Sequence, residues 1–250
     1  MRALPLAALG IVAYGAFLVA TMPASFLLAR AQGALPGKLE VLEVGGTAWH
    51  GSARVVVNSP GGPIAVERLE WHWLPARLAG GRFAFNIAAR ANNIDARYEG
   101  ARTPSSWEVR ALEVKGDAQA LATLLPWIAA WRPEGQVTIT SPQLTTDGSE
   151  LRGEARVEWK GAAVSLSEVK PLGSYRADIA AEGHAGRLKV TTLEGALQVA
   201  GEGTLTPPTR LAFKGEARAA GEQAKALELL LNLLGPARAD GARTLDWRVN

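Results

Sequence analysis

The stretch Leu69-Glu70-Trp71-His72-Trp73 alternates large apolar side chains with polar ones. A period of two places the three apolar side chains on one face of a β-strand and the two polar ones on the other. The turn-forming cluster 58–63 lies upstream and Pro75 lies downstream. Proline lacks the N–H that a strand ladder needs, so we expect a half-buried strand that Pro75 ends.

The same alternation recurs along most of the chain, with turn signals about every ten residues. Besides 64–73, strands are predicted at 38–44, 47–57, 83–89, 94–99, 107–115, 136–144, 150–160, 163–169, 175–182, 187–192, 195–206, 209–218 and 245–249. Many apolar positions hold Ala, Gly or Thr. The pattern therefore favours a mainly β fold with one long, curled antiparallel sheet over a compact sandwich.

Two interruptions with helical spacing separate the strand runs. One helix is predicted at 118–125, with Asp117 as its N-cap, and a second at 221–234, which Gly235-Pro236 stops. The layout of strand run followed by helix occurs twice. It suggests two similar halves of the β domain, 39–131 and 136–250.

Residues 3–29 carry no charged side chain. As one helix, this run would be roughly 40 Å long, against a hydrocarbon core of about 30 Å. We therefore predict a transmembrane signal-anchor at 1–30, a linker at 31–38 and an exported β domain at 39–250. A cleaved secretory signal peptide is the alternative, although the apolar region of such peptides is usually only about 7–15 residues long.

Composition narrows the class of protein. The chain has 250 residues, a net charge of +3 and no cysteine, so no disulfide stabilises it. Basic residues are mixed with acidic ones, whereas nucleic-acid binding needs a clustered basic patch. We expect no nucleic-acid partner.

No catalytic constellation can be assembled from the sequence. There is no Cys nucleophile, no phosphate-binding glycine loop, and His50, His72 and His184 lack the short spacings of a zinc site. We predict a non-enzymatic protein with no catalytic, cofactor-binding or metal-binding residue. The eight tryptophans are interpreted mainly as core rather than as an aromatic binding surface.

Two motifs carry a resemblance to a known family. The first has two parts, Gly46-Thr47-Ala48-Trp49-His50-Gly51-Ser52-Ala53 and then Leu69 to Leu78, and the second is Pro171-Leu172-Gly173-Ser174-Tyr175-Arg176. Their order, together with the apolar N-terminal segment, resembles the protein N family of the type II (general) secretion system. The candidate structural or interaction residues are Gly46, Thr47, Trp49, Gly51, Trp71, Trp73, Pro75, Pro171, Leu172, Gly173, Ser174, Tyr175 and Arg176.

The resemblance implies a single-pass protein of the bacterial inner membrane with a periplasmic β domain. Such a protein is an accessory to the export of folded proteins across the outer membrane. The implied partners are the platform, the pseudopilus or the periplasmic part of the secretin. The first motif and the curled sheet are also similar to AsmA-like envelope proteins, so the alternative is a protein that binds or conducts lipid along an apolar β-groove.

Overall fold

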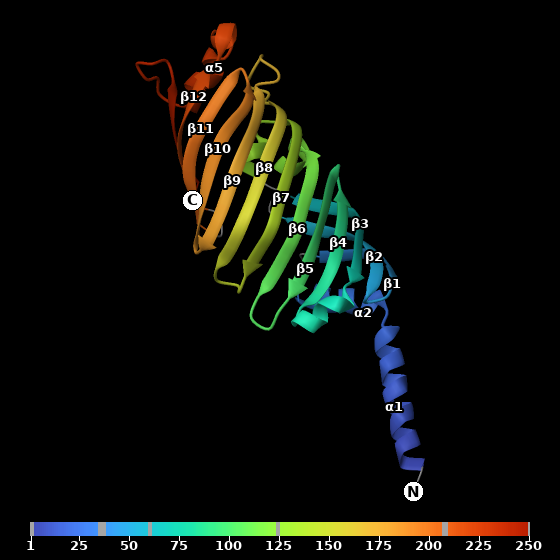
Figure 1. Ribbon diagram of the computed structural model, residues 1–250. Coiled ribbons are helices and arrows are strands. Elements are labelled where there is room, and N and C mark those ends of the chain that lie inside the picture. Colours follow the sequence, from blue (N-terminus) through green and yellow to red (C-terminus); the bar gives the residue numbers. More distant parts are fainter. Residues whose placement is uncertain (1–2, 35–38, 60–61, 124–125, 207–209, 250) are drawn as a thin grey trace.

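A computed structural model describes residues 3–34, 39–59, 62–123, 126–206 and 210–249. In these ranges thirteen strands form one sheet in the order β1 to β13, each antiparallel to the next (Figure 1). The strands are β1 Leu39–Gly46, β2 His50–Ser59, β3 Gly62–Trp73, β4 Phe83–Ala91, β5 Ile94–Arg102, β6 Trp107–Asp117, β7 Glu134–Thr146, β8 Leu151–Ala163, β9 Gly173–Gly183, β10 Ala185–Gly195, β11 Leu197–Thr206, β12 Arg210–Ala219 and β13 Arg243–Val249. The mainly β prediction is confirmed, as one long meander.

The helices are short and lie at the ends of the sheet or outside it. They are α1 Ala3–Ala20, α2 Ala24–Ala34, the 3-10 helix η1 Pro75–Gly80, α3 Ala118–Ala122, α4 Pro126–Ala129, the 3-10 helix η2 Gly221–Ala224 and α5 Glu228–Leu234. Helix α1 points away from the sheet, whereas α5 lies at the opposite end of the molecule (Figure 1).

Strand pairing aligns one apolar residue from every strand on the same face. Each residue of this apolar row pairs with an apolar residue of the neighbouring strand. The row therefore contains no charged side chain. It consists of Val44, Ala53, Leu69, Ala89, Ala96, Val114, Ile139, Val157, Ala177, Val190, Gly201, Gly215 and Leu245. We call the side of the sheet that bears this row the apolar face.

The neighbouring row points to the other side and is polar. From β8 to β13 its charges alternate in sign in the order Arg156, Asp178, Lys189, Glu202, Lys214 and Asp246. The Arg156 Nε donates to Asp178 Oδ1 at 2.7 Å. Opposite charges directly across a ladder stabilise strand pairing, so this charged face supports the register.

The best-packed core lies under the C-terminal end of the sheet. Phe213 and Leu245 are buried there against Leu227 and Leu230 of the helical segment after β12. Val164 and Leu172, from the loop between β8 and β9, complete it. The predicted strand at 163–169 is wrong, because β8 ends at Ala163 and the chain turns there to cover the apolar face.

The predicted single helix over 3–29 is also wrong. Helix α1 ends at Ala20, and α2 begins at Ala24. Pro23 cannot donate an N–H to a continuing helix, and it forms a β-bridge with Thr47 instead. None of the helices within the described ranges has both the length and the apolar character that a bilayer crossing needs.

Both internal helices are shorter than predicted. Asp117 is extended and makes no capping hydrogen bond with α3. Its carboxylate instead accepts from Asn93 Nδ2 and Gln136 Nε2, which joins the turn between β4 and β5 to β6 and β7. The predicted residues 124–125 lie outside the described ranges. The second helix is split into η2 and α5.

The two predicted halves remain a prediction. Each helical excursion follows six strands, since α3 and α4 come after β6 and η2 and α5 come after β12. The sheet itself runs without a break between the halves, because β6 pairs with β7 along most of its length.

Close packing at one glycine pair gives a stability test. A Cβ added at Gly201 would lie 2.5 Å from the backbone oxygen of Lys214 and 2.5 Å from Phe213 Cζ. We expect Gly201→Val to lower the free energy of unfolding by about 1–3 kcal/mol through overpacking, measured by urea denaturation. Ala200→Val, an exposed position in the same strand on the other face, is the control and should change it little. Equal effects of the two substitutions would contradict this packing.

Candidate functional site: the motif residues and the apolar face

The first motif forms the turn between β1 and β2. Gly46 has a φ of +83°, a value that favours glycine. The Thr47 hydroxyl accepts from the backbone N–H of Trp49 at 3.3 Å and of His50 at 3.2 Å. These hydrogen bonds fix the turn locally. They leave the Trp49 indole free to contact other elements.

The motif tryptophans join this turn to its neighbours. Trp71 Nε1 donates to the carbonyl oxygens of Thr47 and Ala48, at 3.2 and 3.1 Å. A Cβ at Gly51 would lie 2.5 Å from the Trp71 ring, so only glycine allows the indole to approach so closely. Trp49 Nε1 donates to the Val19 carbonyl of α1 at 2.7 Å, and its ring centroid lies 4.9 Å from that of Trp73.

Pro75 begins η1 immediately beyond β3. The strand ends at Trp73, and Leu74 N–H donates to the Ala84 carbonyl in the next strand. The prediction that Pro75 ends this strand is therefore confirmed.

The second motif lies at the start of β9. Its first peptide bond, Lys170–Pro171, is cis. Leu172 is buried; its N–H donates to the Ala162 carbonyl and its carbonyl accepts from Leu197 N–H. Gly173 is packed so tightly that a Cβ there would collide with the Glu194 carbonyl oxygen.

The polar residues of the second motif divide between the two faces. The buried Ser174 hydroxyl donates to Glu194 Oε1 at 3.0 Å. Arg176 donates two hydrogen bonds to Glu158 Oε1, at 3.1 and 2.9 Å. The Tyr175 hydroxyl, near the strand start as expected, donates to the Leu197 carbonyl at 2.9 Å. Burial raises the pKa of Tyr175, so the phenol stays protonated and remains a donor.

The structure does not bring the two motifs together. Five strands, β4 to β8, separate β3 from β9. At the usual strand spacing this is roughly 30 Å along the sheet. Each motif fixes its own corner of the fold.

A cavity of about 700 Å³ opens on the apolar face beneath α5. Its walls are mostly hydrophobic side chains from the sheet, from α5 and from the segment after α3. The residues that define it include Ile128, Trp131, Trp159, Val190, Leu211 and Leu234. Sequence reasoning missed this cavity because its walls come from segments far apart in the chain.

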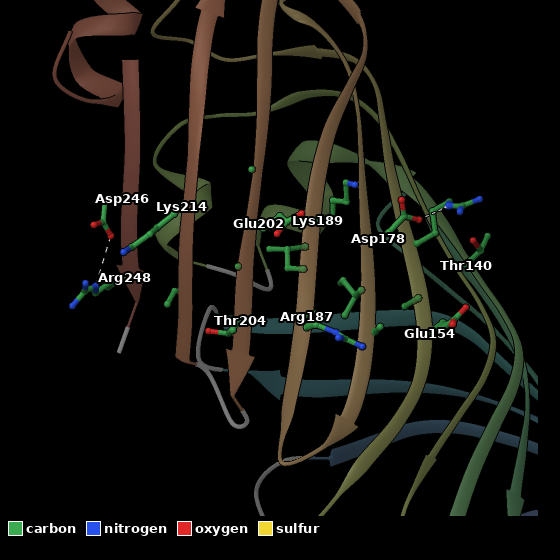
Figure 2. A pocket seen from close by; sticks show the side chains of 18 of the residues that line it. Thr140, Glu154, Asp178, Arg187, Lys189, Glu202, Thr204, Lys214, Asp246 and Arg248 are labelled. Carbon is green, nitrogen blue, oxygen red and sulfur yellow. Dashed lines mark hydrogen bonds and ion pairs between the residues drawn. The ribbon is translucent and has the colours of Figure 1, made fainter. Parts of the chain in front are cut away.

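A second cavity, of about 1600 Å³, is bordered by the alternating charges of the other face (Figure 2). Five basic and four acidic side chains line it. Figure 2 shows Arg248 paired with Asp246, and Asp178 forms an ion pair with Arg156. Because the charges compensate one another, this cavity presents no strong field of one sign to a charged ligand.

Two histidines that are distant in sequence meet through strand pairing. His50 and His72 are register partners, and their ring centroids lie 4.9 Å apart. The absence of short spacings between histidines in the sequence therefore did not reveal this pair. In the ranges that the structure covers, no group of three or more His, Cys, Asp or Glu side chains could hold a metal ion.

The tryptophans are less buried than expected. Trp107, Trp131 and Trp247 are exposed, so the interpretation as core is wrong for these three. Trp49, Trp71, Trp73 and Trp159 are half-buried. The side chain of Trp127 lies outside the described residues.

The fold is a single antiparallel meander with one apolar and one charged face. It defines a β-sheet protein in which extended surfaces, rather than a cluster of reactive side chains, are the main candidate sites. The family "Type II secretion system (T2SS), protein N" matches residues 37–246 of this chain. The chain belongs to this family of type II secretion system components.

A relative supports the assignment over most of the chain. The "Type II secretion system protein N" of Pectobacterium carotovorum subsp. carotovorum is 26% identical over 249 residues, which cover 95% of this chain and 93% of the relative. No solved structure matches the chain.

The Tyr175 hydrogen bond offers a direct test of the second motif. We expect Tyr175→Phe to lower the free energy of unfolding by about 1 kcal/mol, because the Leu197 carbonyl loses its hydroxyl donor. Tyr98→Phe is the matched control, since Tyr98 is also half-buried and its hydroxyl has no hydrogen bond among the described residues. If urea denaturation gave equal changes for both variants, the bond would not contribute to stability.

Proposed function

We propose that the protein is a non-enzymatic accessory component of the type II secretion system, anchored in the bacterial inner membrane with its sheet in the periplasm. Residues 1–30 are the anchor in this proposal: α1 enters the bilayer, although none of the described helices is long and apolar enough to cross it alone. Its partners are other proteins of the secretion system, in the platform, the pseudopilus or the periplasmic part of the secretin. Its role is to support the export of folded proteins across the outer membrane.

The observation that carries this proposal is the position and chemistry of α1. This helix extends away from the sheet (Figure 1). Ile11, Val12, Tyr14 and Phe17 are all more than 60% exposed, so the β domain does not bury them. A large contiguous apolar surface that a protein leaves exposed indicates contact with a membrane or a partner. Family membership selects the secretion machinery as the setting.

A charge placed in α1 tests the anchor. Val12→Arg should release the chain from membranes, because an arginine at the centre of a membrane helix costs about 2.5–3.5 kcal/mol on insertion scales. The measurement is the fraction of chain that resists alkaline extraction from membranes, together with secretion of a folded exoprotein in a host strain that lacks the gene.

The control is Leu229→Arg, which adds the same charge to an exposed position of α5. The wild-type chain and this control should remain in the membrane and restore secretion, whereas Val12→Arg should do neither. Retention of Val12→Arg at wild-type levels would refute the anchor. Normal secretion in the strain that lacks the gene would refute the accessory role.

A second function, binding or conduction of lipid, is favoured by the apolar face. The apolar row crosses all thirteen strands, and only Ala53 and Leu245 in it are buried. The cavity of about 700 Å³ extends this surface beneath α5. Its size and apolar lining suit an acyl chain.

Filling the cavity tests lipid binding. Ala177 lines the cavity, whereas Ala180 in the same strand lines the charged cavity on the other face. Ala177→Trp should reduce the phospholipid that co-purifies with the chain, measured by mass spectrometry of extracts, while Ala180→Trp should leave it unchanged. Equal amounts of lipid with both variants would remove this second function.

A further inference from the structure

One end of the apolar face carries four aromatic rings and an arginine that lies between two of them. The Trp49 and Phe83 ring centroids lie 6.3 Å apart, and Trp73 contacts both rings. Phe83 is the register partner of Arg102, which in turn pairs with Trp107. We call these five residues the aromatic rim.

The rim also contains a cation stacked on a ring. The Arg102 guanidinium carbon lies 4.8 Å from the centroid of the Trp107 ring. Stacking holds the arginine beside the indole while its N–H groups remain able to donate. The rim therefore offers apolar area and hydrogen-bond donors side by side.

The outer part of the rim is open to solvent. Phe83 is 43% exposed and Trp107 is 57% exposed. Leu78 of η1, the short helix between β3 and β4, is 49% exposed at the same end of the sheet. Three large apolar side chains left this far uncovered indicate a surface that contacts something else.

The rim is fixed to the end of α1 by direct bonds. Trp49 Nε1 donates to the Val19 carbonyl at 2.7 Å, and Ala48 N–H donates to the Met22 carbonyl at 2.8 Å. Ala24, at the start of α2, is fully buried. In Figure 1, α1 leaves the sheet at the end where α2 lies. The position of the C-terminal end of α1 therefore fixes the position of the aromatic rim.

We infer that the aromatic rim and Leu78 rest on the periplasmic surface of the bilayer that α1 enters. Tryptophan and arginine side chains are favoured at that depth, because the ring enters the apolar boundary while the polar group reaches the headgroups. The continuity of the rim with α1 favours lipid over a protein partner. This inference rests on the proposed membrane anchor, and it orients the sheet with its apolar face opening at the bilayer.

Single cysteines can locate the rim, because the chain has none of its own. Leu78→Cys and Trp107→Cys are labelled with a nitrobenzoxadiazole fluorophore in the full chain. The chain is reconstituted into phosphatidylethanolamine–phosphatidylglycerol vesicles, with or without nitroxide-labelled lipid. Leu229→Cys and Leu233→Cys are the matched controls, since both positions are exposed, lie in α5 away from the rim and do not line the apolar cavity.

Nitroxide lipid should quench the fluorophore at positions 78 and 107 several-fold more strongly than at 229 and 233, and emission at the rim should shift to the blue. Flotation of the vesicles reports the anchor separately. A chain that floats but shows equal quenching at all four positions would overturn the seating of the rim and leave the anchor intact. Blue-shifted emission at the rim without nitroxide quenching would indicate a protein contact, such as a second copy, and would also overturn it. A chain that does not float would overturn both.

Discussion

The register between strands is the constraint on which the rest of the structure depends. Because side chains alternate with a period of two, a slip of one residue in any ladder would move a whole strand's apolar side chains to the charged face. The apolar row and the alternating charges from Arg156 to Asp246 are two consequences of the same pairing. A shift at β10 would place Lys189 in the apolar row and Val190 among the charges. The shifted register would therefore be less stable on both faces.

The bonds between the β1–β2 turn and the N-terminal segment set where the sheet begins. In the sequence, the uncharged run over 3–29 looks like one helix, because helix-forming residues continue past Pro23. In the structure, the carbonyl of Met22 accepts from Ala48 N–H and Pro23 bridges Thr47. The turn between β1 and β2 thus takes up backbone groups that a continuous helix would have used internally. Met22 and Ala48 are 26 positions apart in the sequence, and Pro23 and Thr47 are 24 apart, so local pattern cannot reveal this competition.

The same distinction explains which parts of the fold could be predicted. Alternation in Leu69 to Trp73 is local, so the strand and its end at Pro75 followed directly from the sequence. The pairing of His50 with His72 and the cavity beneath α5 depend on which strands lie side by side, and no local spacing encodes that. The loop after Ala163 was mistaken for a strand because Val164 and Leu172 are apolar for a different reason, namely packing onto α5 and Phe213. The motif glycines were interpretable, since a positive φ at Gly46 and the close approach of Trp71 to Gly51 are what glycine permits.

A sheet with one apolar face normally buries that face against a second layer. Here α5 and the loop before β9 cover only the C-terminal end, where Phe213 and Leu245 are buried. Over the remaining strands, residues such as Val114 and Ile139 stay half-buried. The twist and curl of a long sheet can shield part of such a surface but cannot replace a second layer. The chain therefore keeps a broad apolar surface at a cost in stability, which makes sense if another molecule completes the layer. An apolar face that opens beside the end of α1 is well placed to receive that molecule from the bilayer that we propose α1 enters.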